Sequence, residues 1–322
     1  MKDRYGREIH AMRISVTDRC NMRCQYCMSS MTPEFSPREN LLTLEEIDQV
    51  ITAATYLGFD SFRFTGGEPL VRRGIVDLIT RVGRLKSIRR LSLSTNGTFL
   101  AANLDALAAA RVTRLNISLD SLQPERYARI TRGADLAPVR DAIEKAVAHG
   151  AFNVKLNTVL VRGFNDDEIA NIAALTIDQP VSVRFIEYMP FGEWKDCPDA
   201  SKMMSVAEMI TRLRERYDVA ESAGPGGEGP ARYMQIKGAR GYVGLISPVY
   251  EPFCARCNRL RLTADGRIKS CLLDDEQSNL RDWMRGPDYS FDKLILRIAA
   301  AILAKPEKHS YSRNFNMSTV GG

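Results

Sequence analysis

The chain has 322 residues, of which 44% are hydrophobic, and a formal charge of +6 at neutral pH. This is an ordinary globular composition, and the length predicts one large domain and a smaller one. Residues 1–13 are charged and show no apolar stretch typical of a secretory signal, and the apolar run 294–304 is too short to span a bilayer. We therefore expect a cytoplasmic protein with no membrane contact. Basic residues are not interleaved with aromatic ones in dense blocks, which disfavours nucleic acid as a partner.

Short β-type segments alternate with helical ones along the first two-thirds of the chain. The six predicted strands are Met12–Val16, Ser61–Thr65, Leu91–Thr95, Arg114–Leu119, Asn153–Val161 and Ser182–Tyr188. Between the first two, Thr43 and Glu46 form a capping box that begins a helix, and Gly58 ends it. This alternation predicts an α/β fold, an incomplete parallel barrel of six βα units whose loops after the strands collect the binding groups.

The pattern changes after a second capping box, formed by Ser205 and Glu208, which begins a helix running to about Arg216. The glycine-rich residues 224–230 lack the Lys-Ser/Thr of a phosphate-binding P-loop, so we expect a solvated loop there. Two hairpins follow, 233–236 with 242–246 and 260–263 with 267–272, and then helices over 279–285 and 291–304. We predict two domains, residues 1–220 and 221–322, the second closing the open side of the barrel.

Six of the seven cysteines lie in two triplets. The triplets are Cys20, Cys24 and Cys27, just after the first strand, and Cys254, Cys257 and Cys271, on either side of the second hairpin. In a reducing compartment, clustered cysteines indicate metal binding or catalysis and not disulfides. A 4Fe-4S cluster normally takes four cysteines, so three thiolates leave one iron open to another ligand. We therefore expect two 4Fe-4S clusters, each with one open iron.

A zinc site is the weaker interpretation of the second triplet. Structural zinc takes four ligands, and none of the three histidines lies near either triplet in the sequence. The remaining cysteine, Cys197, is better interpreted as an inert apolar side chain. Two other classes of protein remain as rivals: a zinc-dependent nucleic-acid-binding module, and a two-cluster electron-transfer protein in which every iron is fully ligated.

The segment Thr65-Gly66-Gly67-Glu68-Pro69 directly follows the second predicted strand. Its glycines let the backbone approach a ligand closely, and Glu68 offers a carboxylate acceptor. Together with the first triplet, this segment resembles the radical S-adenosylmethionine (radical SAM) superfamily. The resemblance implies that S-adenosylmethionine binds the open iron, that Glu68 holds its amino group, and that one-electron reduction releases a 5'-deoxyadenosyl radical.

Residues 116–121, 185–190 and 254–266 and the final Gly-Gly resemble, within that superfamily, the GTP 3',8-cyclase family of molybdenum cofactor biosynthesis. The resemblance implies that the radical takes the ribose 3'-hydrogen of GTP, with guanine held at the second cluster, and that 3',8-cyclo-7,8-dihydro-GTP is formed. It also implies a reducing electron donor, and cyclic pyranopterin monophosphate synthase as pathway partner. The rival within the superfamily is an enzyme with an auxiliary cluster that acts on a peptide.

The family resemblance implies roles for individual residues. S-adenosylmethionine would contact Tyr26, Gly67, Glu68, Ser118 and Met189. GTP would be bound by Arg13, Arg63, Ser94, Lys155, Arg259, Leu260 and Arg261. The expected catalytic residues are Arg259, Arg261, Gly321 and Gly322. Arg13, Arg63 and Lys155 also stand in apolar strands, where a buried cation is costly unless an anion such as a triphosphate meets it. Two positions depart from the family pattern, Ser94 for threonine and Ser29 for proline.

Overall fold

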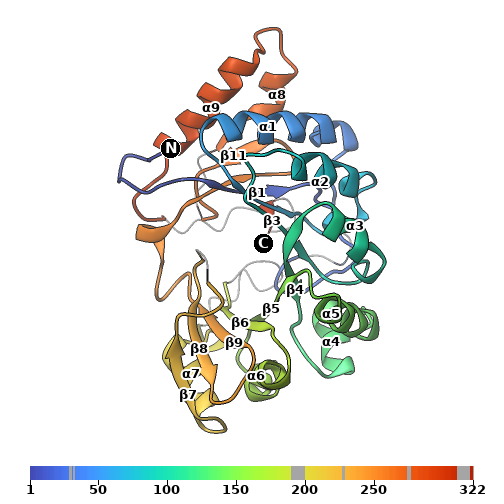
Figure 1. Ribbon diagram of the computed structural model, residues 1–322, viewed down its shortest axis with the longest axis vertical. Coiled ribbons are helices and arrows are strands. Elements are labelled where there is room, and N and C mark those ends of the chain that lie inside the picture. The colour runs from blue at the N-terminus through green and yellow to red at the C-terminus, as the bar shows by residue number, and fades with distance from the viewer. Residues whose placement is uncertain are drawn as a thin grey trace.

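The computed structural model describes residues 1–28, 31, 33–189, 200–226, 229–273, 277–309 and 320–321. In this part of the chain one curved sheet contains twelve strands, in the order β12-β11-β10-β1-β2-β3-β4-β5-β6-β9-β8-β7. Helices cover its outer side, and Figure 1 shows the sheet as an arc that stays open at the left. Within the run from β10 to β9, every pair of neighbouring strands is parallel. This is the predicted incomplete parallel barrel.

The six predicted strands are confirmed as β1 (Ala11–Ser15), β2 (Ser61–Thr65), β3 (Arg90–Thr95), β4 (Val112–Ser118), β5 (Asn153–Leu160) and β6 (Ser182–Glu187). The helices on the outer side are α1 (Leu44–Tyr56), α2 (Ile75–Gly83), α3 (Leu104–Ala109), α4 (Pro124–Thr131), α5 (Ala137–His149) and α6 (Ile169–Asp178). The capping box is confirmed as well, because Glu46 N donates to Thr43 Oγ1 and Thr43 N donates to Glu46 Oε2. Gly58 follows the helix at a φ of +86°.

The C-terminal part extends the sheet at both edges. Its elements are α7 (Val206–Arg214), β7 (Val219–Ser222), β8 (Arg232–Ile236), β9 (Tyr242–Ile246), β10 (Arg259–Leu262), β11 (Arg267–Lys269), β12 (Gln277–Asn279), α8 (Leu280–Met284) and α9 (Phe291–Leu303). β9 lies parallel to β6 and β10 lies parallel to β1, while β7, β8, β11 and β12 join antiparallel. Among the described strands, β12 and β7 remain separate edges, so strand pairing does not close the sheet. That this part closes the open side in another way stays a prediction.

Both predicted hairpins are confirmed, as β8 with β9 and β10 with β11. Strand β7 was not foreseen, because half of its residues are exposed and it has no buried apolar alternation. The predicted division between residues 220 and 221 falls inside this strand and stays a prediction. In the described part of the chain, no helix is long and apolar enough to cross a membrane.

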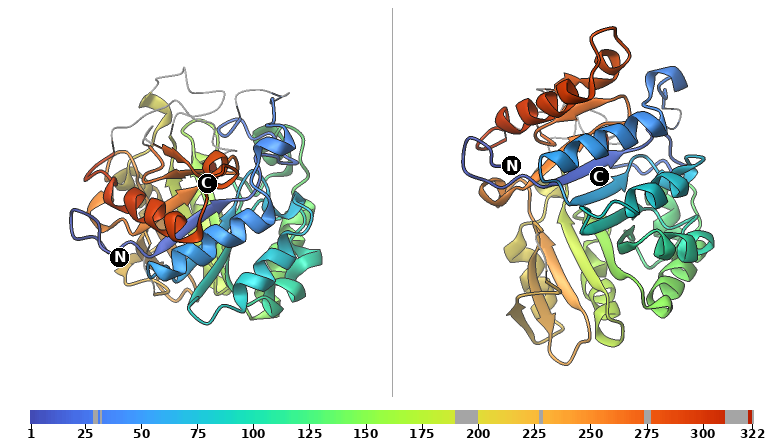
Figure 2. Two further views of the ribbon diagram at one scale, coloured as in Figure 1. Left: turned by 90° about the horizontal axis from the view of Figure 1, so that it is seen from above. Right: turned by 45° about the horizontal axis from the view of Figure 1, so that its top comes forward.

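The strand sequences explain which side of the sheet forms the core. Along β1, Met12 and Ile14 are buried in the apolar cluster beneath the outer helices, whereas Arg13 between them faces the inside of the arc. Tyr56 at the end of α1 packs edge-on against Phe291 of α9, with ring centroids 5.7 Å apart. Figure 2 shows these two helices side by side. The outer face of the sheet thus makes the core, and the inner face is free for charged residues.

Candidate active site

The loop after β1 carries the first cysteine triplet and packs against the Gly66-Gly67 turn after β2. Gly67 N donates to Thr17 O at 2.7 Å, and Glu68 N donates to Arg19 O at 2.8 Å. A Cβ at Gly67 would lie 2.2 Å from Arg19 O, so only glycine permits this approach. We expected the glycines to make room for a ligand, but the close neighbour in the structure is the cysteine loop itself.

The three thiols of the first triplet are free and half-buried. Cys20 Sγ accepts hydrogen bonds from Met22 N at 3.4 Å and from Asn96 Nδ2 at 3.7 Å. Burial, the negative charge on Cys20 and that on Asp120 raise the pKa of Cys27 to about 12. Burial and the neighbouring anions also raise the pKa of Cys24 well above its usual range. Such thiols ionise readily only when bound metal supplies positive charge, so this donor set fits an iron-sulfur cluster.

Within the described residues, no three Cys, His, Asp or Glu side chains lie close enough together to hold one metal ion. A zinc ion takes ligands that converge on one centre, whereas the thiolates of a 4Fe-4S cluster lie around a larger group.

Glu68, directly after the glycines, is a fully buried carboxylate. Its Oε1 accepts from Leu70 N at 3.0 Å and Thr95 Oγ1 at 2.8 Å, and its Oε2 accepts from Asn96 N at 2.7 Å. Burial raises the pKa of Glu68 to about 7, although these hydrogen bonds act in the opposite direction. The carboxylate thus ties the end of β2 to the end of β3 beside Cys20.

Tyr26 anchors the cysteine loop through its side chain. Its hydroxyl donates to Asp120 Oδ2 at 2.8 Å, while Asp120 Oδ1 accepts from Val159 N at 2.9 Å. Burial raises the pKa of Asp120 to about 6. Asp120 thus joins the cysteine loop to β5, and it was not among the expected site residues. Ser118 ends β4 and half-buried Met189 follows β6, at the same carboxyl edge of the sheet as the loop.

The expected GTP-binding residues lie side by side on the inner face of the sheet. Arg13 is in register with Arg261 of β10 on one side and Arg63 of β2 on the other. Further along, Ser94 is in register with Asn116, which is in register with Lys155. Residues in register on neighbouring strands point to one face, so strand pairing assembles these side chains into one surface. Leu260 is fully buried in the apolar core and offers only its backbone to this face.

Arg184 of β6 belongs to the same surface and was missed in the sequence. Its Nε donates to Asn157 Oδ1 at 2.9 Å, and its Nη2 donates to Asn116 Oδ1 at 2.5 Å. The sequence carried a signal for Arg184, namely a cation between two apolar residues of a strand. Arg184 stands between the buried Val183 and Phe185, just as Lys155 stands between apolar neighbours.

The inner surface is strongly positive. Burial and the charge of Arg184 lower the pKa of Lys155 to about 7, and the same two causes lower the pKa of Arg63 to about 9. Burial and the charge of Arg261 lower the pKa of Arg13 well below its usual range. Among the described residues none of these five cations pairs with a carboxylate, and Arg13 Nε is buried without a hydrogen-bond partner. Buried cations that repel one another require a bound anion.

The second triplet lies at the opposite end of the strands from the first. Cys254 begins a 3-10 turn, Cys254–Arg256, and Cys257 lies two residues before Arg259, the first residue of β10, which is in register with Ala11 at the start of β1. The cysteine loop of the first triplet follows the carboxyl end of β1. Because β1 has five extended residues, this end lies about 16 Å from its amino end. We expected the binding groups to collect after the strands, but the second triplet lies at their amino edge, with the cations between the triplets.

Cys257 differs electrostatically from the first triplet. Burial alone would raise the pKa of its thiol, but the charges of Arg259 and Lys305 and hydrogen bonds from both residues lower it to about 6. Burial and the charge of Arg259 lower the pKa of Arg261 to about 10, while Cys271 and Cys257 oppose that change. The Arg261 guanidinium therefore lies close enough to interact with both thiols.

The C-terminal tail reaches this surface. Arg261 Nη1 donates to Gly321 O at 2.6 Å, and a Cβ at Gly321 would lie 2.5 Å from Thr65 Cγ2. Figure 1 accordingly marks the C-terminal end inside the arc of the sheet. Gly321 therefore lies against the cationic surface. Gly322, Cys197 and Ser29 lie outside the described residues.

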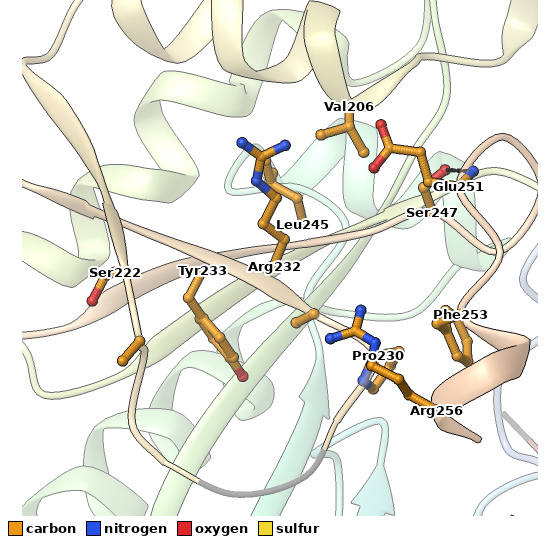
Figure 3. Close-up of a pocket in the computed structure, with 12 residues that line it drawn as sticks. Val206, Ser222, Pro230, Arg232, Tyr233, Leu245, Ser247, Glu251, Phe253 and Arg256 are labelled. Atoms are coloured by element: carbon orange, nitrogen blue, oxygen red, sulfur yellow. Dashed lines mark hydrogen bonds between the residues drawn. The ribbon is translucent and has the colours of Figure 1, made fainter. Parts of the chain in front are cut away.

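A cavity of about 390 Å³ opens between β8, β9 and the segment that leads to Cys254. Figure 3 shows Arg232, Tyr233, Phe253 and Arg256 among its lining residues. Lys155 Nζ donates to Tyr233 Oη at 3.4 Å, so this cavity borders the cationic surface.

Comparisons with known proteins agree with this geometry. The family description Radical SAM superfamily matches residues 14–176, and Molybdenum Cofactor Synthesis C matches residues 181–311. The chain is 42% identical to the GTP 3',8-cyclases of Alkaliphilus oremlandii, over 328 aligned residues, and Pelotomaculum thermopropionicum, over 327. Each of these alignments covers 100% of both proteins. The GTP 3',8-cyclase of Listeria monocytogenes serovar 1/2a is 43% identical over 96% of the chain and 92% of that protein.

Among solved structures, Streptococcus suis SuiB bound to precursor peptide SuiA matches with a TM-score of 0.59. The match covers 94% of this chain and 72% of SuiB at 13% identity, which shows a shared fold alone.

The curved parallel sheet and the cysteine loop after its first strand are those of the radical SAM superfamily, whose members use a 4Fe-4S cluster and S-adenosylmethionine. Within that superfamily, the chain belongs to the GTP 3',8-cyclase family.

The contact of Gly67 with the cysteine loop predicts the effect of Gly67→Ala. The added methyl group must displace Arg19 and with it the first triplet, so we expect the iron content after anaerobic reconstitution to fall by about half. Gly229→Ala is the matched control, since a Cβ there meets nothing within 4 Å. Iron and sulfide analysis measures the outcome, and a Gly67→Ala protein with the iron content of the wild type would contradict this role of the glycine.

Proposed function

We propose that the chain converts GTP to 3',8-cyclo-7,8-dihydro-GTP, the first step of molybdenum cofactor biosynthesis. Relatedness over the full length to enzymes named GTP 3',8-cyclase supports this function. The structural observation that carries it is the buried cationic surface between two cysteine triplets, because its charge and position suit a nucleoside triphosphate.

The first triplet is the proposed site of the radical-generating cluster. Cys20, Cys24 and Cys27 would hold a 4Fe-4S cluster, which with bound S-adenosylmethionine supplies the 5'-deoxyadenosyl radical. The proposed contacts to S-adenosylmethionine are Tyr26, Gly67, Glu68, Ser118 and Met189. Two of these residues also fix the loop: Tyr26 through Asp120, and Glu68 through Asn96. They would therefore fix the position of the cofactor relative to the cysteine loop.

The second triplet is the proposed site of a further 4Fe-4S cluster, held by Cys254, Cys257 and Cys271. Its open iron would bind the guanine of GTP. The distance between the triplets, about the length of β1, leaves room for a nucleotide between them. Arg259 and Arg261 follow Cys257 and would contact the nucleotide next to this cluster.

The cations between the triplets would bind the triphosphate. Arg13, Arg63 and Lys155 are the proposed contacts from the first strands and β5, and we add Arg184, which lies on the same face. Guanidinium groups bind phosphate oxygens with two hydrogen bonds each, which fixes orientation as well as charge. Ser94 and the backbone of Leu260 complete the proposed GTP contacts.

The chain's own contribution to catalysis is to orient GTP and to exclude water from the radical. Arg261 donates to the tail at Gly321, so the tail lies against the same arginine that would contact GTP. We propose that Arg259, Arg261, Gly321 and Gly322 act together on the bound nucleotide. The proposed partners are a reducing electron donor and cyclic pyranopterin monophosphate synthase, which would receive the product.

Anaerobic reconstitution with GTP, S-adenosylmethionine and a strong reductant tests this function. We expect 5'-deoxyadenosine and the cyclised nucleotide to appear together in chromatography and mass spectrometry. Formation of 5'-deoxyadenosine with unchanged GTP and intact clusters would overturn the substrate and favour the peptide-acting alternative.

The position of Arg261 predicts that Arg261→Ala lowers GTP turnover ten- to a hundredfold with little change in iron content, because charge-assisted bonds to substrate and tail are lost. Arg267→Ala in the same hairpin is the control, since Arg267 pairs with Asp265 at the surface. Parallel loss of turnover and iron would instead make Arg261 a structural residue.

The lowered pKa of Lys155 predicts proton uptake on nucleotide binding. At pH 8 a lysine with a pKa of about 7 is mostly neutral, and a triphosphate beside it favours the charged form and raises its pKa. Binding of GTP to the unreduced enzyme at pH 8 should therefore take up close to one proton. Calorimetry in two buffers of different ionisation enthalpy measures the uptake, and equal uptake by the wild type and Lys155→Arg would refute the assignment.

A further inference from the structure

Lys305 is a buried cation at the second cysteine triplet that the proposed function does not use. It follows α9 by two residues, and only 3% of its surface is exposed. Its Nζ donates to Arg259 O at 3.0 Å and to Ser270 O at 2.5 Å. The side chain also hydrogen-bonds the thiol of Cys257. Within the described residues it forms no ion pair with a carboxylate.

The two carbonyl groups belong to the chain segments that carry the cysteines. Arg259 lies two residues after Cys257, and Ser270 directly precedes Cys271. The ladder between β10 and β11 includes the pairs Arg261 with Lys269 and Leu262 with Ile268. One residue further on, where Leu260 and Ser270 would pair next, the ammonium group of Lys305 bridges the two segments instead. It therefore fixes the distance between Cys257 and Cys271.

The charge of Lys305 is as significant as its bridging position. Carbonyl acceptors satisfy the donors of a buried ammonium group but supply no net negative charge, so a compensating anion is still required. The nearby thiolates supply this compensating negative charge. Three thiolates outweigh the 2+ core of an oxidised 4Fe-4S cluster, and one-electron reduction adds a further negative charge. A fixed cation at a cysteine ligand stabilises the reduced cluster more than the oxidised one.

We propose that Lys305 is a positioning residue of the second cluster, holding Cys257 and Cys271 at ligating distance and favouring the cluster's reduced state. The inference rests on the proposed second cluster. Lys305 would also connect the second cluster to the helical layer, because it follows α9, which packs against α1 on the outer side of the sheet.

Three variants of the full-length reconstituted enzyme test the inference. Lys305→Met keeps the length of the side chain without its charge, Lys305→Arg keeps the charge, and Lys308→Met changes an exposed lysine three residues away. Iron content is measured first. A redox titration followed by electron paramagnetic resonance, with and without S-adenosylmethionine, then separates the signals, since the signal that responds to S-adenosylmethionine belongs to the first cluster.

In Lys305→Met we expect the equilibrium constant for reduction of the second cluster to fall about tenfold, which is about 59 mV in potential. Lys305→Arg and Lys308→Met should keep the wild-type potential. Loss of the second cluster alone in Lys305→Met, with both clusters kept in Lys305→Arg, also supports the role. A Lys305→Met enzyme with two clusters and the wild-type potential overturns it, as does Lys305→Arg behaving like Lys305→Met. Wild-type enzyme with a single cluster would instead refute the second cluster.

Discussion

The repulsion among cations buried inside the curved sheet is the constraint on which the rest of the structure depends. Arg13, Arg63, Lys155 and Arg184 lie on one face, and burial together with repulsion from neighbouring cations lowers the pKa of each, although Tyr233 opposes this change at Arg184. A protein can keep such a surface only if the rest of the fold is stable without it and an anion compensates its charge in the working state. The apolar outer face beneath the helices meets the first condition. The proposed triphosphate would meet the second.

The parallel sheet gives this surface two different ends. The first triplet lies after β1. Cys254 and Cys257 of the second triplet lie before β10, the parallel neighbour of β1, and Cys271 follows β11 at the same edge, so the arginines of β1 and β10 lie between the two triplets. The electrostatics of the two ends also differ. Anionic neighbours and burial raise the pKa of Cys27, whereas Arg259 and Lys305 lower that of Cys257. Two 4Fe-4S clusters would therefore lie in different electrostatic surroundings, the first among negatively charged groups and the second among positively charged ones.

Much of this could be predicted from the sequence because it depends on local pattern. The strand alternation, the Thr43 capping box and the hairpin at Asp265-Gly266 are local signals, and all are confirmed. What could not be predicted depends on pairing between distant segments. No local signal places β9 beside β6 and β10 beside β1, or Lys305 between two carbonyls at the second triplet. Arg184 had the same signal as Lys155 and was overlooked, and the partner of Gly67 became clear only with the cysteine loop in place.

We propose that the inner surface is positively charged to bind a triphosphate. The dissociation constants of GTP, GDP, GMP and guanosine for the reconstituted, unreduced enzyme at fixed ionic strength test this proposal. We expect a stepwise loss of affinity as each phosphate is removed, together more than about a hundredfold, and a loss that shrinks as salt is added. Equal affinity for GTP and guanosine would contradict it, because the cations would then serve some purpose other than binding phosphate.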